Sequence, residues 1–273
     1  QGNLPTLIIG RSCPWAHRAW LIYTLKNLNK SINIIEAKPS PNKGKWHFNP
    51  QLLGCNYLDE VYNLCNSPTN QRSTVPTLID PCDLQTKQPK ILGNESAQLI
   101  EVLNQWPTER EEINLYPNDK AKEINKWNNL LQSKVNDGVY RCGFARNQIA
   151  YELASKELFN SLEKIEDTLR SGGPWICGEE MTLTDIRLFP TLIRWETIYM
   201  PLFGCSAHPL WRYPKIWEWR KKLFNIPKVS MTCDSDKWRK DYFGNLFPLR
   251  PNQIIPENEE LVNIVNANPP KTL

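Results

Sequence analysis

Two kinds of pattern follow each other along this chain of 273 residues. Up to about residue 105, short apolar runs of strand length alternate with segments of helical periodicity. From residue 119 to residue 243 the periodicity is helical only. A helix between the first two apolar runs predicts parallel strands. The order βαβ, then ββα, then helices is typical of a thioredoxin-like domain followed by a helical bundle.

The predicted domains follow from this change of pattern, in an α/β plus all-α fold. We predict a thioredoxin-like domain at 4–105, a proline-bounded linker at 106–118, an all-helical domain at 119–243 and an extended tail at 244–273. The expected strands are 4–9, 31–37, 77–80 and 91–92, the expected helices are 14–29, 58–66, 97–104, 121–135, 148–169, 183–200 and 214–223, and 39–54 is expected to be a loop.

The composition excludes several classes of protein. Lys and Arg total 33 against 29 Asp and Glu, and the net charge of +4 is too small to indicate a nucleic-acid partner. A mean hydropathy of −0.52 and the lack of a long apolar run argue against a membrane-spanning helix. The eight cysteines form no CxxC pair and no zinc-type cluster with the three histidines. We therefore expect free thiols in a reducing, cytoplasmic compartment, and no metal.

A cysteine at the start of the first predicted helix is the strongest candidate for a reactive group. Cys13 follows an apolar run and precedes Pro14, which suits a first helical turn because it lacks an N–H. Unpaired N–H groups and the positive end of the helix dipole meet here, so we expect the pKa of the Cys13 thiol to be depressed. Arg11, His17 and Arg18 add positive charge in the same stretch. The alternative is a buried structural cysteine in a strand-to-helix turn.

Two other positions in the first domain leave alternatives open. Pro76 precedes an apolar strand, either as a trans proline, which is the default, or as a cis proline that leaves the Val75 backbone free for a ligand. Glu95 and Ser96 open a later helix. They either cap it or supply a carboxylate and a hydroxyl to a ligand's amino and carboxylate groups.

A capping box marks the start of the most apolar helical segment. Asp185 stands three residues after Thr182, and the segment that follows is apolar on all sides. We therefore predict a central core helix over 183–200 in which Asp185 has a structural role.

Five motifs together carry a family resemblance. They are Cys13-Pro14-Trp15-Ala16-His17-Arg18, Thr74-Val75-Pro76, Asn94-Glu95-Ser96, Gly138-Val139-Tyr140 with Gly143-Phe144-Ala145, and the run 185–192. In this order they resemble the glutathione transferase superfamily, and more specifically its Xi class, the glutathionyl-hydroquinone reductases. The resemblance covers residues 7–243, which is most of the chain.

The resemblance implies a glutathione transferase fold, a homodimer, glutathione as co-substrate and an aromatic, hydroquinone-type substrate. By this resemblance Cys13 matches the catalytic cysteine, and Pro76 matches the cis proline of the thioredoxin-like fold. The matching glutathione-binding positions are Trp46, Arg72, Val75, Pro76, Glu95 and Ser96. Tyr140, Tyr199 and Tyr242 match tyrosines around the hydroquinone site, and simple packing is the alternative role for each.

Alanine at position 16 limits the reactions that are available to the Cys13 thiol. Cys13 lacks the second cysteine of a CxxC site, so an external thiol must resolve any mixed disulfide. We predict a reductase that deglutathionylates glutathionyl-hydroquinones through a Cys13–glutathione mixed disulfide, with tyrosines as proton donors. The alternatives are an Omega-like thioltransferase or dehydroascorbate reductase, and a non-catalytic binding protein of the same fold.

Overall fold

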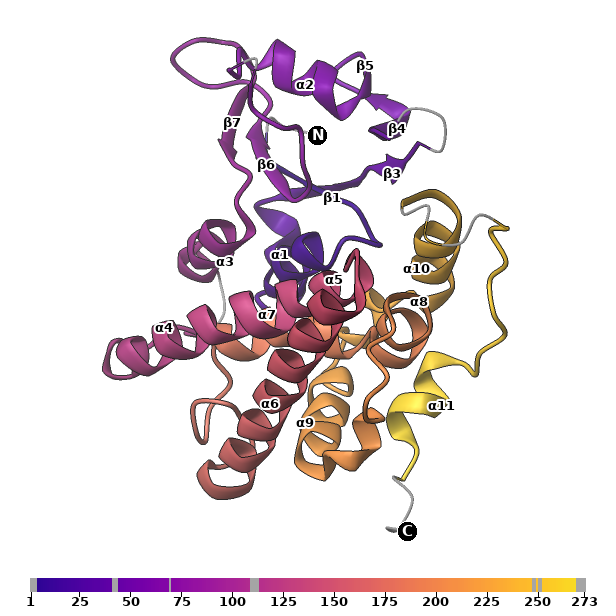
Figure 1. The fold of residues 1–273 in the computed structure, drawn as a ribbon. Helices are drawn as coiled ribbons and strands as arrows, with labels where there is room; N and C mark the ends of the chain where they lie inside the picture. Colours follow the sequence, from indigo (N-terminus) through magenta and orange to yellow (C-terminus); the bar gives the residue numbers. More distant parts are fainter. Residues whose placement is uncertain are drawn as a thin grey trace. The chain divides into compact units, whose positions relative to one another are not determined.

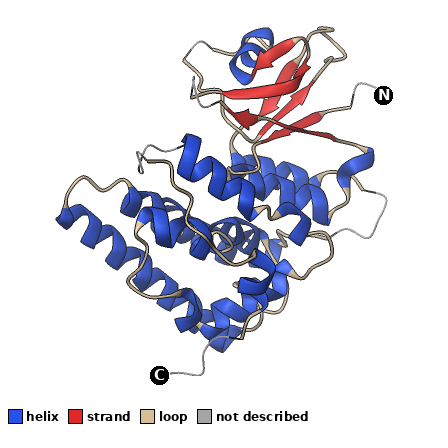
Figure 2. Ribbon diagram, turned by 90° about the vertical axis from the view of Figure 1, so that its right-hand side faces the viewer, coloured by secondary structure: helices blue, strands red, loops and turns tan. Residues whose placement is uncertain are grey.

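The computed structural model describes residues 4–40, 44–68, 70–108, 113–246, 249 and 252–268. The chain forms two compact units, and each unit contains two separate segments. The first unit holds Gln1–Ile113 and Asp236–Ile254, and the second holds Asn114–Ser235 and Ile255–Leu273. The described strands belong to the first unit, whereas the second is built from helices (Figure 1, Figure 2). The predicted fold class is confirmed.

A four-stranded mixed sheet forms the centre of the first unit. All four side chains of its strand β1 are buried, so β1 shows no alternation of buried and exposed positions. Helices α1 and α3 pack against each other in the same unit. The sheet order is β2 (Asn33–Glu36), β1 (Thr6–Ile9), β6 (Thr77–Asp80) and β7 (Lys90–Gly93), with β1 parallel to β2 and the other pairs antiparallel.

Helix α1 (Pro14–Leu25) ends before the predicted residue 29. Asn27 adopts the left-handed conformation, with φ of 56°, which asparagine tolerates better than most residues. A turn of 3-10 helix then continues over Leu28–Lys30. Helix α3 (Ser96–Gln105) agrees with the predicted helix to within one residue at each end.

The segment that we predicted as a loop at 39–54 contains a second, three-stranded sheet, so that prediction was wrong. Its strands are β3 (Lys38–Pro39), β4 (Trp46–Leu52) and β5 (Cys55–Tyr57), and helix α2 (Leu58–Leu64) follows. Strand β4 escaped detection because it contains Pro50, carries exposed polar side chains and pairs irregularly with β5 between His47 and Leu52. Proline is tolerated in a sheet at such irregular positions.

Helix α7 (Leu183–Leu192) is the core of the second unit. All ten of its side chains are buried, which confirms the predicted core helix, and Thr182 and Asp185 form the predicted capping box. The regular helix ends before residue 200. Pro190 lies inside its last turn, where a proline cannot donate a helical hydrogen bond, and a π-helical turn follows at Trp195–Tyr199.

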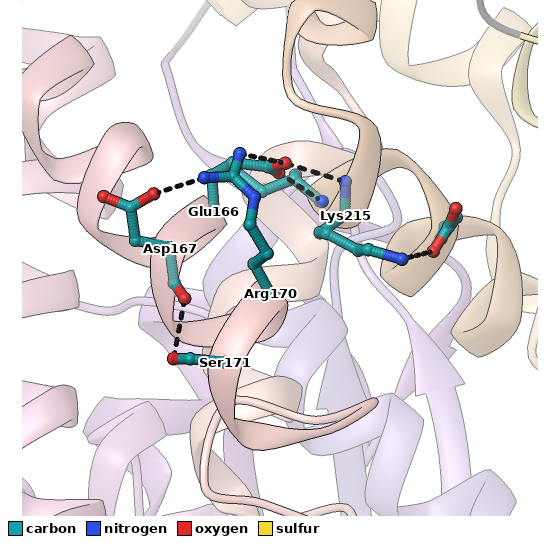
Figure 3. Close-up of polar contacts among 7 residues, drawn as sticks. Glu166, Asp167, Arg170, Ser171 and Lys215 are labelled. Carbon is teal, nitrogen blue, oxygen red and sulfur yellow. Dashed lines mark hydrogen bonds and ion pairs between the residues drawn. The ribbon is translucent and has the colours of Figure 1, made fainter.

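The other helices of the second unit surround this core. A carboxylate of one helix caps another: Glu166 of α6 accepts hydrogen bonds from the backbone N–H groups of Lys215 and Ile216, at 3.1 and 2.9 Å (Figure 3). These N–H groups have no partner within their own helix. The helices are α4 (Ala121–Leu130), α5 (Asp137–Gly143), α6 (Gln148–Gly172), α8 (Met200–Phe203) and α9 (Pro214–Phe224), with a π-helical turn at Leu131–Asn136 and 3-10 turns at Asn118–Lys120, Leu210–Arg212 and Ser230–Thr232.

The C-terminal region differs from the predicted helical domain and extended tail. Helix α10 (Ser235–Asp241) and a π-helical turn (Tyr242–Leu246) lie in the segment that joins the first unit. Helix α11 (Leu261–Asn266) lies within the predicted tail and packs on α9. The Trp217 indole donates to the carbonyl of Ala267 at 3.0 Å, which fixes the end of α11. Helix α11 was not predicted because a helix of only about two turns gives too short a periodic pattern in the sequence.

Candidate active site

Cys13 occupies the N-cap position of α1. Its N–H donates to the carbonyl of Gly10 at 2.9 Å, and Pro14 begins the helix as predicted. The first turn carries no acidic residue that would offset the positive end of the helix dipole. Cys13 is half-buried, unlike Cys142 and Cys205, which are fully buried. This exposure favours a reactive thiol over a structural cysteine.

Each of the three cationic residues near Cys13 contacts an aromatic or acidic neighbour. The Arg11 guanidinium pairs with Glu36 at 2.9 Å, and Arg18 lies over the Trp15 ring at 4.2 Å. The His17 imidazole is 1% exposed, and its ring centroid lies 6.0 Å from that of the Trp20 ring. The positive charge that the sequence places in this stretch is therefore held by specific neighbouring side chains.

The Val75–Pro76 peptide bond is cis, so the resemblance was right and the trans default was not. The Val75 carbonyl lies 3.5 Å from Cys13 Sγ, which places this backbone beside the thiol. The side chain that supports this loop, Tyr62, carries no local signal in the sequence. The Tyr62 hydroxyl lies 2.9 Å from Thr77 Oγ1 and accepts a hydrogen bond from Asn94 Nδ2 at 3.0 Å, which joins the Val75 loop to the start of α3.

Glu95 and Ser96 form the start of α3. Glu95 is the N-cap residue, but its exposed carboxylate makes no capping hydrogen bond, so capping does not account for it. Arg18 Nη1 donates to Ser96 Oγ at 3.3 Å, and Arg18 is only 1% exposed. A buried positive charge therefore lies next to the N–H groups that open the helix, and both favour an anionic ligand group.

Trp46 and Arg72 complete the predicted glutathione positions within the first unit. Trp46 begins β4, and its ring lies so close to Gly10 that a Cβ built there would overlap it. Glycine at this position is therefore required by the close approach of an aromatic ring. Arg72 is exposed in the segment before Val75.

The three predicted tyrosines divide between the two units. Tyr140 of α5 and Tyr199 lie in the second unit, with ring centroids 5.9 Å apart, and Phe203 packs against both rings at 5.2 and 5.5 Å. Tyr140 also lines a cavity of about 690 Å³. Tyr242 belongs to the same unit as Cys13 and is 1% exposed.

Burial disfavours the thiolate form at several of the other cysteines. All eight cysteines are free in the structure, as predicted. Burial raises the pKa of Cys65 to about 11 and that of Cys233 to about 12, and burial also raises the pKa of Cys55. Among the residues that the structure describes, no group of three or more His, Cys, Asp or Glu could hold a metal ion. None of the helices in these ranges is long and apolar enough to cross a bilayer.

Comparison with known proteins identifies the fold and its class. Residues 12–106 match the family model of the glutathione S-transferase N-terminal domain, and residues 148–222 match that of the C-terminal domain. The chain is 32% identical to glutathionyl-hydroquinone reductase PcpF of Sphingobium chlorophenolicum, over 92% of this chain and 81% of that protein.

Solved structures show the same likeness. Glutathione transferase Xi 1 from Trametes versicolor is 30% identical, with a TM-score of 0.84 over 94% of this chain and 91% of that chain. The glutathione-bound structure of YqjG from Escherichia coli is 27% identical, with a TM-score of 0.85 over 96% of this chain and 87% of that chain. The fold and the matches show that the chain belongs to the glutathione S-transferase family. Within that family it is a member of the Xi class.

Proposed function

We propose that this chain is a glutathionyl-hydroquinone reductase. The observation that carries the proposal is Cys13 at the N-cap of α1, half-exposed beside the Val75 carbonyl, with alanine rather than a resolving cysteine at position 16. A lone thiol at such a site suits a cycle in which glutathione supplies the second thiol. The names of the relatives, a glutathionyl-hydroquinone reductase and a glutathione-bound homologue, support this choice of substrates.

The proposed reaction has two steps. In the first, the Cys13 thiolate attacks the glutathionyl sulfur of the substrate, forming a Cys13–glutathione disulfide and breaking the bond between sulfur and the aromatic carbon. The aromatic carbon keeps the electron pair and takes up a proton, which gives the free hydroquinone. In the second step, the thiolate of another glutathione attacks the mixed disulfide, releasing oxidised glutathione and the Cys13 thiolate. Overall the aromatic carbon is reduced by two electrons, and the thioether sulfur of the substrate and the thiol sulfur of the second glutathione are oxidised to a disulfide.

The binding residues follow from the same unit. We assign the γ-glutamyl end of glutathione to Glu95 and Ser96, where an unused carboxylate and the buried charge of Arg18 meet the start of α3. The peptide part lies along the Val75 backbone, and Trp46, Arg72 and Pro76 complete the site. The protonation of the aromatic carbon is assigned to Tyr140, Tyr199 and Tyr242, since phenols are suitable proton donors.

Steady-state turnover tests this function against its alternatives. With glutathione present, glutathionyl-menadiol is expected to yield menadiol and one oxidised glutathione per substrate. The rate should exceed the rates with a small mixed disulfide and with dehydroascorbate. A protein that reduces only the latter two substrates is an Omega-like thioltransferase, and a protein that binds no glutathione in calorimetry is a scaffold.

Gly10 provides a test of the Trp46 assignment. In Gly10→Ala the new methyl group must displace the Trp46 ring, so the KM for glutathione is expected to rise about tenfold, equivalent to roughly 1.4 kcal/mol of binding. Gly172→Ala is the matched control, because a Cβ there meets nothing within 4 Å. Equal KM values for wild type and Gly10→Ala would remove Trp46 from the binding site.

We also propose a cytoplasmic homodimer. Free thiols persist in reducing compartments, and this chain carries eight of them. Ile149 and Leu153, one turn apart on α6, are 71% and 61% exposed and provide apolar surface for a second copy. Light scattering of the purified chain measures the assembly, and a monomer at micromolar concentration would contradict this part of the proposal.

A further inference from the structure

One buried hydrogen bond joins the loop before Cys13 to the C-terminal end of α10. Ser12 Oγ and Asp241 Oδ2 are in hydrogen-bond contact although they lie 229 positions apart in the sequence, and the two residues are 0% and 7% exposed. Both lie in the first unit. Ser12 directly precedes Cys13, and Asp241 directly precedes Tyr242. Because neighbouring Cα atoms are about 3.8 Å apart, this bond constrains the backbones of the nucleophile and of one proposed proton donor together.

Two further contacts hold α10 on either side of the same loop. Lys237 pairs with Glu36, whose other oxygen accepts the Arg11 side chain at 2.9 Å. The Trp238 ring is fully buried, and its centroid lies 5.9 Å from that of His17. Arg11 and His17 flank Cys13 in sequence, so α10 is anchored before and after the nucleophile.

The hydrogen bond between Ser12 and Asp241 uses a buried carboxylate, which is unusual for a contact that serves packing alone. A buried carboxylate costs free energy unless it is hydrogen-bonded, and an apolar pair would fill the same space without that cost. Burial lowers the pKa of the neighbouring Lys237. The positive charge of Arg11 lowers the pKa of Lys237 further, whereas the carboxylate of Asp241 raises it. A charged group with a specific hydroxyl partner fixes a direction as well as a distance.

We propose that Asp241 is a positioning residue that, through Ser12, sets Tyr242 against the Cys13 loop. The inference rests on the proposed function and deepens it, because it singles out Tyr242 as the tyrosine tied directly to the nucleophile. By positioning Tyr242, the hydrogen bond between Ser12 and Asp241 assists protonation of the departing aromatic carbon. It does not act on thiol–disulfide exchange, which needs Cys13 and glutathione alone.

Two reactions of the same variants separate these roles. Asp241→Ala is expected to lower kcat for glutathionyl-menadiol about 10²-fold, the size of effect that a misplaced catalytic group produces. Reduction of a small mixed disulfide should stay within about twofold of wild type. Asp241→Asn should keep most of the activity, because its amide oxygen accepts the same hydrogen bond from Ser12. Ser12→Ala should match Asp241→Ala, and the double variant should be no worse than either.

Hydrogen exchange supplies a readout that does not depend on activity. The backbone amides of residues 236–246 are expected to exchange faster in Asp241→Ala and Ser12→Ala than in wild type. Asp236→Asn is the matched control, since its side chain on the same helix is 93% exposed.

Three results would overturn the inference: unchanged exchange, an equal loss in both reactions, or an Asp241→Asn variant as impaired as Asp241→Ala. If wild type itself fails to release menadiol, the proposed function is wrong, and the exchange rates still decide whether Asp241 anchors this segment.

Discussion

Replacing Cys13 with alanine is expected to lower turnover of glutathionyl-menadiol by at least about 10³-fold, the scale of loss seen when an enzyme's nucleophile is removed. Position 16 is alanine, so no second thiol in the motif can take over. The fold should persist, because the Cys13 side chain makes no capping hydrogen bond and its backbone bonds to Gly10 and His17 do not need the sulfur.

Cys65→Ala is the matched control for this variant. Burial raises the pKa of Cys65 to about 11, so this thiol is almost wholly protonated at neutral pH and cannot act as a nucleophile there. Turnover of Cys65→Ala should equal that of wild type, and iodoacetamide at neutral pH should modify Cys13 first. Near wild-type turnover by Cys13→Ala would refute the assignment of the nucleophile.

The second large effect is on stability and concerns Asp185. The carboxyl of Asp185 is fully buried and accepts hydrogen bonds from four donors: the Thr182 N–H and hydroxyl, the Ile176 N–H and the Trp219 indole, at 2.8, 3.2, 3.1 and 2.8 Å. Asp185→Ala leaves these buried donors without their acceptor. We expect the free energy of unfolding to fall by roughly 3–5 kcal/mol, as when one partner of a buried charged network is removed.

Urea denaturation measures the free energy of unfolding, and Asp167→Ala is the control variant with which Asp185→Ala is compared. Asp167 pairs with Arg170 at 2.8 Å on the surface of α6, and both side chains are more than half exposed (Figure 3). Such a pair contributes at most about 1 kcal/mol. A loss for Asp185→Ala no larger than that for Asp167→Ala would show that the capping box does not hold the core helix.

The features that could be predicted from the sequence are those determined by residues that lie close together in the chain. The strand, the turn and the Cys-Pro start of α1 lie within residues 6–18, so periodicity and capping rules suffice to place Cys13 at a helix N-terminus. The capping box of Thr182 and Asp185 spans only four residues and was predicted for the same reason. The cis form of the bond before Pro76 came from the resemblance, because the intrinsic preference favours trans.

The missed features depend on long-range contacts or on weak local patterns. Strand β4 contains Pro50 and few buried side chains, so no period of two marks it. The contact between Ser12 and Asp241 has no local signature at all, since it joins residues 229 positions apart. For the same reason Tyr242 was assigned to the helical domain, whereas its contacts place it in the unit of Cys13.

The most direct test of Cys13 as the nucleophile is a single turnover without free glutathione. Purified protein is mixed with one equivalent of glutathionyl-menadiol, quenched with acid and measured by intact mass and peptide mapping. A mixed-disulfide mechanism predicts one menadiol released per chain and one glutathionyl group on the peptide that contains Cys13, removable by added glutathione. Menadiol release with no glutathionyl group on Cys13, or no release until free glutathione is added, would contradict a mixed-disulfide mechanism.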